Sequence, residues 1–110
     1  MIVLGMMSGT SADGIEAVVV ELNMSPERAT PQWRLLHHAS IPFDDALRQE
    51  ILACVRADTG TVDRICALNF NLGAAYADAA LQTIQAAGLE AAQVDLIVNH
   101  GQTVWHIPNH

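Results

Sequence analysis

The feature that most constrains the fold is a short polar segment between two apolar runs. Residues 1–7 form the first apolar run, and residues 15–22, which are rich in valine, form the second. Both runs have the length of strands that are buried on both faces. The segment between them reads SGTSADG and holds the small residues, glycines and aspartate that are typical of turns. The pattern therefore predicts a β-hairpin with a long, glycine-containing loop.

The remaining chain predicts one more strand, two helices and a final strand. Residues 32–41 predict the third strand, with Trp33, Leu35, His37 and Ala39 expected on one face. A helix is expected from residue 44 or 45 to about residue 55, where an aspartate can cap its first turn. A longer helix is expected from residue 61 or 63 to near residue 87, followed by a glycine in the left-handed position. Residues 94–99 predict the last strand.

Apolar spacing gives each expected helix an inner stripe. The first stripe consists of Leu47, Ile51, Cys54 and Val55, and the second of Ile65, Leu68, Leu72, Tyr76 and Ala79. The element order is then strand, strand, strand, helix, helix, strand. Three leading antiparallel strands and a helical crossover to a fourth predict a mixed sheet of the α/β class.

Charge and composition exclude several partners. The net charge is −7, and all five basic residues are scattered arginines. Nucleic acids and anionic membranes both require a basic surface, so neither is an expected partner. The absence of lysine also excludes the Walker phosphate loop, whose lysine reaches the outer phosphates. Without a basic leader or a bilayer-length apolar run, we expect a cytoplasmic protein.

The loop of residues 8–14 is the first candidate site. A phosphate chain needs several backbone N–H groups in one concavity, and glycines let the backbone turn tightly enough to form it. The hydroxyls of Ser8, Thr10 and Ser11 add donors, and Asp13 could hold a magnesium-bound water. The alternative is a hairpin turn without function, for which the same composition is expected.

Residues 100–108 form the second candidate site, because they begin where a buried strand ends. His100, Gln102 and Thr103 offer donors and acceptors that suit sugar hydroxyls, and Trp105 offers an apolar platform. The alternative is a polar loop with a tryptophan anchor. Metal binding by His100, His106 and His110 has little support, since spacings of six and four match no compact zinc pattern.

Three segments resemble one known family, the anhydro-N-acetylmuramic acid kinases. Residues 5–16, GMMSGTSADGIE, are similar to the family's opening signature. Residues 68–73, LNFNLG, with residues 77–79 resemble its first long helix, and residues 100–106, HGQTVWH, with Pro108 resemble its second signature. The resemblance implies a partial ribonuclease-H-like domain of the actin-type ATPases. Residues 1–110 would be the amino-terminal part of the first, nucleotide-binding lobe, with the second lobe absent.

The resemblance also implies an activity. The family phosphorylates 1,6-anhydro-N-acetylmuramic acid with ATP and Mg²⁺, opening the anhydro ring with water to give N-acetylmuramic acid 6-phosphate in peptidoglycan recycling. By this analogy the sugar is contacted by Thr103, helped by His100 and Gln102. The catalytic base is expected beyond His110, so the fragment alone should be inactive, and a homodimer of the full-length protein stays open. The residues implied to bind the ATP phosphates are Gly9, Thr10, Ser11, Ala12, Asp13, Gly14, Ile15 and Glu16.

Two positions depart from the family pattern. Ala12 stands where leucine or methionine is usual, and Glu16 where aspartate is usual. Ala12 should loosen local packing, and Glu16 moves its carboxylate by one methylene. Two other functions remain open at this stage: a non-catalytic module that binds phosphorylated ligands, and another sugar or carboxylate kinase of the same superfamily.

Overall fold

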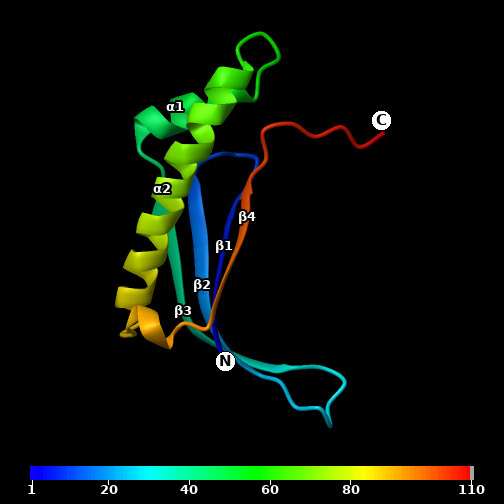
Figure 1. The fold of residues 1–110 in the computed structure, drawn as a ribbon, viewed down its shortest axis with the longest axis vertical. Coiled ribbons are helices and arrows are strands. Elements are labelled where there is room, and N and C mark those ends of the chain that lie inside the picture. The colour runs from blue at the N-terminus through cyan, green and yellow to red at the C-terminus, as the bar shows by residue number, and fades with distance from the viewer. Residues whose placement is uncertain (110) are drawn as a thin grey trace.

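The computed structural model describes residues 1–109, which form one sheet and two helices (Figure 1). The elements in chain order are β1 (Ile2–Ser8), β2 (Gly14–Asn23), β3 (Gln32–Pro42), α1 (Asp45–Cys54), α2 (Val62–Ala86), a short 3₁₀ turn (Ala91–Gln93) and β4 (Leu96–Gln102). The predicted element order is confirmed. Within residues 1–109, no helix is both long and apolar enough to cross a bilayer.

The four strands form a mixed sheet in the order β3-β2-β1-β4. The first two strands pair antiparallel, as do β2 and β3, whereas β4 lies parallel to β1. This arrangement confirms the predicted hairpin and the mixed α/β class, and it is consistent with a partial actin-like ATPase domain. Because β1 and β4 run in the same direction, the loop after β1 and the end of β4 meet at one edge of the sheet.

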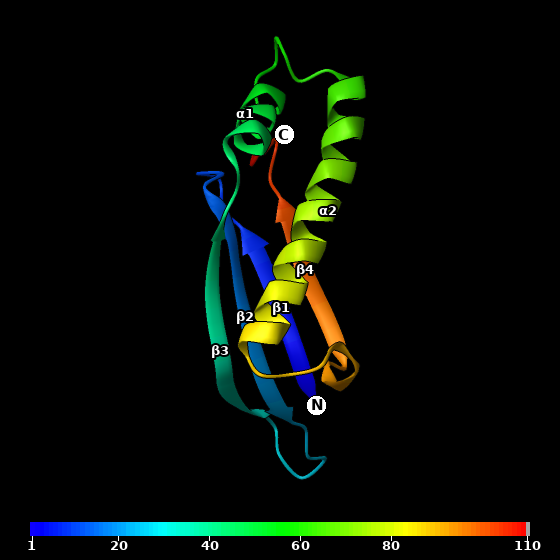
Figure 2. The same cartoon turned by 90° about the vertical axis from the view of Figure 1, so that its left-hand side faces the viewer.

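Helix α2 covers one face of the sheet, and α1 packs beside it on the same side, beyond the ends of the strands (Figure 2). The core between these layers contains Leu4, Ile15 and Val19 from the strands, each almost fully buried, packed with Ile51 of α1 and Leu68 of α2. Asp44 caps α1 as predicted, because its side chain accepts a hydrogen bond of 2.7 Å from the backbone N–H of Leu47. Gly88, with φ of 74°, takes the predicted left-handed position after α2.

The prediction that Trp33, Leu35, His37 and Ala39 lie on one face of the third strand is wrong. A register shift pairs Val19 with His37 but Val20 with Leu35, so that Leu36 is an extra residue in β3. Such a bulge reverses the alternation of side chains on either side of it. Leu35 and Trp33 are consequently 51% and 67% exposed, whereas Leu36 packs against the core.

One residue of the predicted stripe on α2 is also misplaced. Leu68, Tyr76 and Ala79 are buried, and Leu72 is partly buried, but Ile65 is 39% exposed. The first turns of α2 extend beyond the end of the sheet, beside the connection to α1 (Figure 2). A helical stripe is buried only where a second layer covers it, so the periodicity continues past the surface it packs against.

Candidate functional site

The loop between β1 and β2 is closed by a turn around one strained residue. The backbone N–H of Ala12 donates to the carbonyl of Gly9 at 3.1 Å. Ala12 has a φ of 54° and is 1% exposed. The left-handed position of the loop thus belongs to an alanine and not to a glycine, which costs roughly 1–2 kcal/mol by itself. The glycine-based turn predicted from composition differs from the turn that is formed.

Gly14 is required for the close approach of β2 and β3. A Cβ at this position would collide with the carbonyl oxygen of Ile41 and would lie 2.7 Å from Cα of Pro42. Phe43, the first residue after β3, donates its backbone N–H to the carbonyl of Asp13 at 3.0 Å. The exit of the loop is therefore fixed against the end of β3 by contacts between residues far apart in the sequence.

Gln102 joins the loop to the end of β4. The hydroxyl of Ser8 donates to Oε1 of Gln102 at 2.6 Å. Nε2 of Gln102 donates to two carbonyls, that of Gly9 and that of Thr103, each at 3.1 Å. The two segments singled out in the sequence, 94 positions apart at Ser8 and Gln102, are thus in direct contact.

The end of β4 is also held from the helical layer. Tyr76 of α2 donates its hydroxyl to the carbonyl of Gly101 at 3.0 Å. Gly101 has a φ of 78°, and its N–H donates to Oδ1 of Asn99 at 2.7 Å. Burial raises the pKa of the Tyr76 hydroxyl, which therefore keeps its proton and remains a donor at neutral pH. This bond links the core to the second signature.

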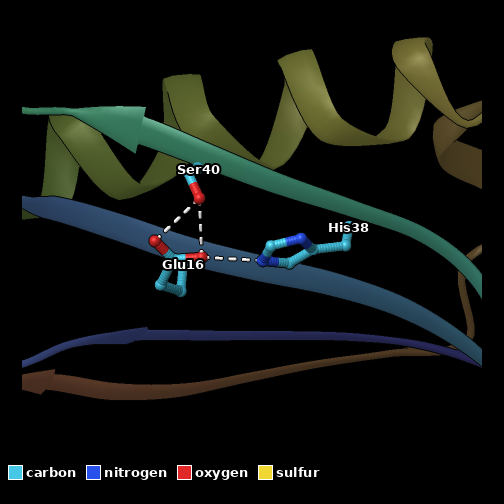
Figure 3. A network of polar contacts seen from close by, with 3 residues as sticks. All are labelled: Glu16, His38 and Ser40. Carbon is cyan, nitrogen blue, oxygen red and sulfur yellow. Dashed lines mark hydrogen bonds and ion pairs between the residues drawn. The ribbon is translucent and has the colours of Figure 1, made fainter.

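Glu16 is bound to the neighbouring strand on the face without helices (Figure 3). Ser40 of β3 donates its hydroxyl to both carboxylate oxygens at 2.8 Å, and Nε2 of His38 is hydrogen-bonded to Oε2 at 2.7 Å. The Ser40 bond, followed by the His38 bond, lowers the pKa of Glu16 below its usual range. The carboxylate is thereby kept charged and directed across the sheet.

Asp13 carries the single carboxylate of the loop. Its side chain is 73% exposed, and Nε of Arg48, from α1, lies 3.6 Å from Oδ1. An ion pair this exposed contributes little to stability. The carboxylate is accessible to solvent, and the hydroxyl-bearing neighbours Thr10 and Ser11 are exposed as well. The predicted role of Asp13 stays a prediction.

Two surface pockets are lined by residues predicted to form the site. One of about 170 Å³ is lined by Asp13, Gly14, Ile15 and Glu16 together with Ser40, Ile41 and Pro42. A second, of about 430 Å³, brings Glu16 together with His100 on the face without helices. Thr103 is partly buried beside Gln102. The ATP and sugar roles of these residues are untested and remain predictions.

The hypothesis of metal binding by His100, His106 and His110 gains no support from the described residues. Within residues 1–109, no three histidine, cysteine or acidic side chains gather as a metal centre would require. His110, the third histidine of that hypothesis, lies outside the described residues.

Sequence reasoning missed the side chains that hold the site. Ser40 and His38 contact Glu16 only because of the register between β2 and β3, in which Glu16 pairs with Ser40. Alternation along β3 does place these two residues on one face, so a known register would have revealed the contact. The contacts of Tyr76 and Ser8 follow from packing and from the parallel pairing of β4, which leave no local signal in the sequence.

Comparison with known proteins finds one family that matches the whole chain. The family described as anhydro-N-acetylmuramic acid kinase matches residues 1–110. A protein of that name from Caldanaerobacter subterraneus subsp. tengcongensis is 42% identical over 98% of this chain. Namesakes from Bacillus cereus and Bacillus thuringiensis subsp. konkukian are 37% and 36% identical over the same share.

The matched region is a limited part of those relatives. The chain spans 27–28% of their length. In this chain, the two segments that resemble the family's signatures, residues 5–16 and 100–106, meet at the same edge of the sheet. The chain belongs to the anhydro-N-acetylmuramic acid kinase family.

Proposed function

We propose that this chain is the nucleotide-binding part of an enzyme that phosphorylates 1,6-anhydro-N-acetylmuramic acid with ATP. Membership of the family and the names of the relatives support the substrate and the reaction type. In the reaction, water adds to the anomeric carbon and the anhydro bond breaks. The freed O6 takes the γ-phosphoryl group, and ADP leaves. One proton is released, and no residue of this chain is assigned as the base that accepts it.

The observation that carries this proposal is the contact between the two signatures. Ser8 and Gly9, at the start of the loop, are both hydrogen-bonded to Gln102 at the end of β4. An in-line phosphoryl transfer requires that the phosphate donor and the acceptor hydroxyl be held close together. A loop for the nucleotide and a segment for the sugar at one sheet edge meet that requirement.

In this proposal the loop contacts the phosphates through backbone N–H groups and through Thr10 and Ser11, whose side chains are exposed. Magnesium fits the donor set, because it prefers oxygen ligands and retains most of its waters. Asp13, with its exposed carboxylate, would hold the ion through a water. When bound, the ion would neutralise charge on the phosphates.

The sugar would lie against the segment that follows β4. Thr103 and His100 are the proposed contacts, Thr103 through its hydroxyl and His100 through an exposed imidazole. Positioning of the two substrates, together with stabilisation of the developing charge, would supply most of the rate acceleration.

The test uses the full-length protein, ATP, Mg²⁺ and the anhydrosugar, with mass spectrometry to detect the sugar 6-phosphate. Gly9→Val is the matched variant, because a Cβ at Gly9 meets no atom closer than Ser11 Oγ at 4.0 Å and the fold should tolerate it. Its side chain would stand where the phosphates approach, so ATP turnover should fall at least tenfold. Gly73→Val, at an open position of α2, is the control. Normal turnover by Gly9→Val would contradict the proposal, as would phosphorylation of an ordinary sugar in preference to the anhydrosugar.

A further inference from the structure

The carboxamide of Gln102 is almost fully occupied within the chain. A carboxamide has two N–H donors and one oxygen with two lone pairs. Both donors are directed at backbone carbonyls, those of Gly9 and Thr103, and the oxygen accepts from Ser8. Only one lone pair remains for any other partner. The side chain is therefore a poor group for binding a sugar hydroxyl, although its residue type suggests that use.

The partner of Gln102 in the loop is the carbonyl that closes the turn. Gly9 O accepts from Nε2 of Gln102 and also from the backbone N–H of Ala12. Ala12 is the left-handed, buried residue of the loop. A strained residue keeps its conformation only where the surrounding contacts over-determine it. Gln102 supplies such a contact from another strand.

Ser8, which donates to the side-chain oxygen of Gln102, is also constrained. Ser8 is 2% exposed, so its hydroxyl has little access to water. Loss of the Gln102 oxygen would leave a buried hydroxyl without its acceptor, which is unfavourable. The bonds at Ser8 and Gly9 thus fix both the direction in which the chain leaves β1 and the orientation of the first loop carbonyl.

We propose that Gln102 is a positioning residue for the phosphate-binding loop and makes no contact with the sugar. It acts through Ser8 and Gly9 on the conformation of Ala12 and hence on the N–H groups that face the nucleotide. This inference rests on the proposed function for its kinetic consequence, but the structural consequence at the loop is independent of it.

The kinetic experiment compares Gln102→Met with wild type in the full-length protein. Methionine has similar length and removes all three hydrogen bonds. Distortion of the loop should raise KM for ATP about tenfold, which corresponds to about 1.4 kcal/mol of lost binding free energy. KM for the anhydrosugar should stay within about twofold of wild type. A raised KM for the sugar with an unchanged KM for ATP would overturn the inference, because it indicates direct sugar contact.

The second readout needs no substrate. Hydrogen exchange of the peptide covering residues 8–14 should become faster in Gln102→Met and in Ser8→Ala, which removes the hydroxyl from the other side. Gln85→Met, at an exposed glutamine of α2, serves as the control and should leave this peptide unchanged. Unchanged exchange in both variants would overturn the inference. If wild type lacks ATP-dependent activity, the proposed function fails, and exchange alone decides the role of Gln102.

Discussion

The two turns at opposite ends of β2 differ in the way they are held. The loop of residues 9–13 contains an almost fully buried alanine and is bonded to Gln102 and Phe43, far away in the sequence. The turn of residues 24–31 contains one serine and two prolines, and its hydrogen bonds are local, from the backbone N–H groups of residues 27 and 28 to Ser25. Figure 1 shows this second turn projecting beyond the sheet.

The difference shows that long-range contacts distinguish a built site from a connection. Glycine, serine and aspartate are expected in either kind of turn. Of these two turns, the first lies beside the end of β4, which runs parallel to β1, and the side chain of Gln102 reaches its Gly9 carbonyl. Substitutions at the end of the sheet that holds the loop should therefore lower the free energy of unfolding more than substitutions at the distal end.

The largest effect is expected at Gly14, where the loop enters β2. Gly14→Ala places a Cβ against the carbonyl of Ile41 and Cα of Pro42, so β2 and β3 must separate locally. We expect a loss of about 3 kcal/mol in the free energy of unfolding, at the upper end for overpacking. The shift in the urea unfolding midpoint measures it. Gly9→Ala, where a Cβ has open space, is the control and should change stability far less. Equal effects of the two substitutions would refute the steric argument.

A smaller effect is expected at the link between α2 and the end of β4. Tyr76→Phe removes the donor to the carbonyl of Gly101 and keeps the buried ring. We expect destabilisation of about 1 kcal/mol, the typical net value of a single hydrogen bond. Urea melts give the stability, and hydrogen exchange of residues 99–103 should report a local loosening. A variant as stable as wild type would show that the bond does not hold this edge of the sheet.

The fold follows from the sequence more fully than the site does. Apolar runs and helical periodicity predict the four strands and both α-helices, but not the 3₁₀ turn Ala91–Gln93. They fail at Leu36 and Ile65, where a bulge and the end of the sheet decide burial. Signature residues mark where the site lies, but the bonds of Ser8, Gln102 and Tyr76 depend on strand register and packing. Those are properties of the whole fold that no local window contains.

The Glu16 network should produce an effect confined to acid pH. Hydrogen bonds from Ser40 and His38 lower the pKa of Glu16 from its ordinary value of 4.5. A lowered carboxyl pKa in the folded state adds stability above the unfolded pKa, and this stability is lost as pH falls through the folded value. Glu16→Gln should therefore show a shallower decline of unfolding free energy with pH below about 4.5 than wild type. Glu27→Gln, an exposed change in the distal turn, is the control, and identical slopes for all three proteins would contradict the network's role.

The smallest effect is expected in the turn of residues 24–31. Met24 is 67% exposed, and among residues 1–109 the hydrogen bonds of this turn reach no other element. Met24→Ser should change the free energy of unfolding by no more than about 0.5 kcal/mol, as is usual for surface substitutions. KM for ATP in the full-length protein should be unchanged, since the turn lies at the opposite end of β2 from the loop. A marked loss of stability or of ATP binding would mean that the distal turn is held by contacts with the remaining three quarters of the family's chain length. The two turns would then differ less than their contacts within this chain suggest.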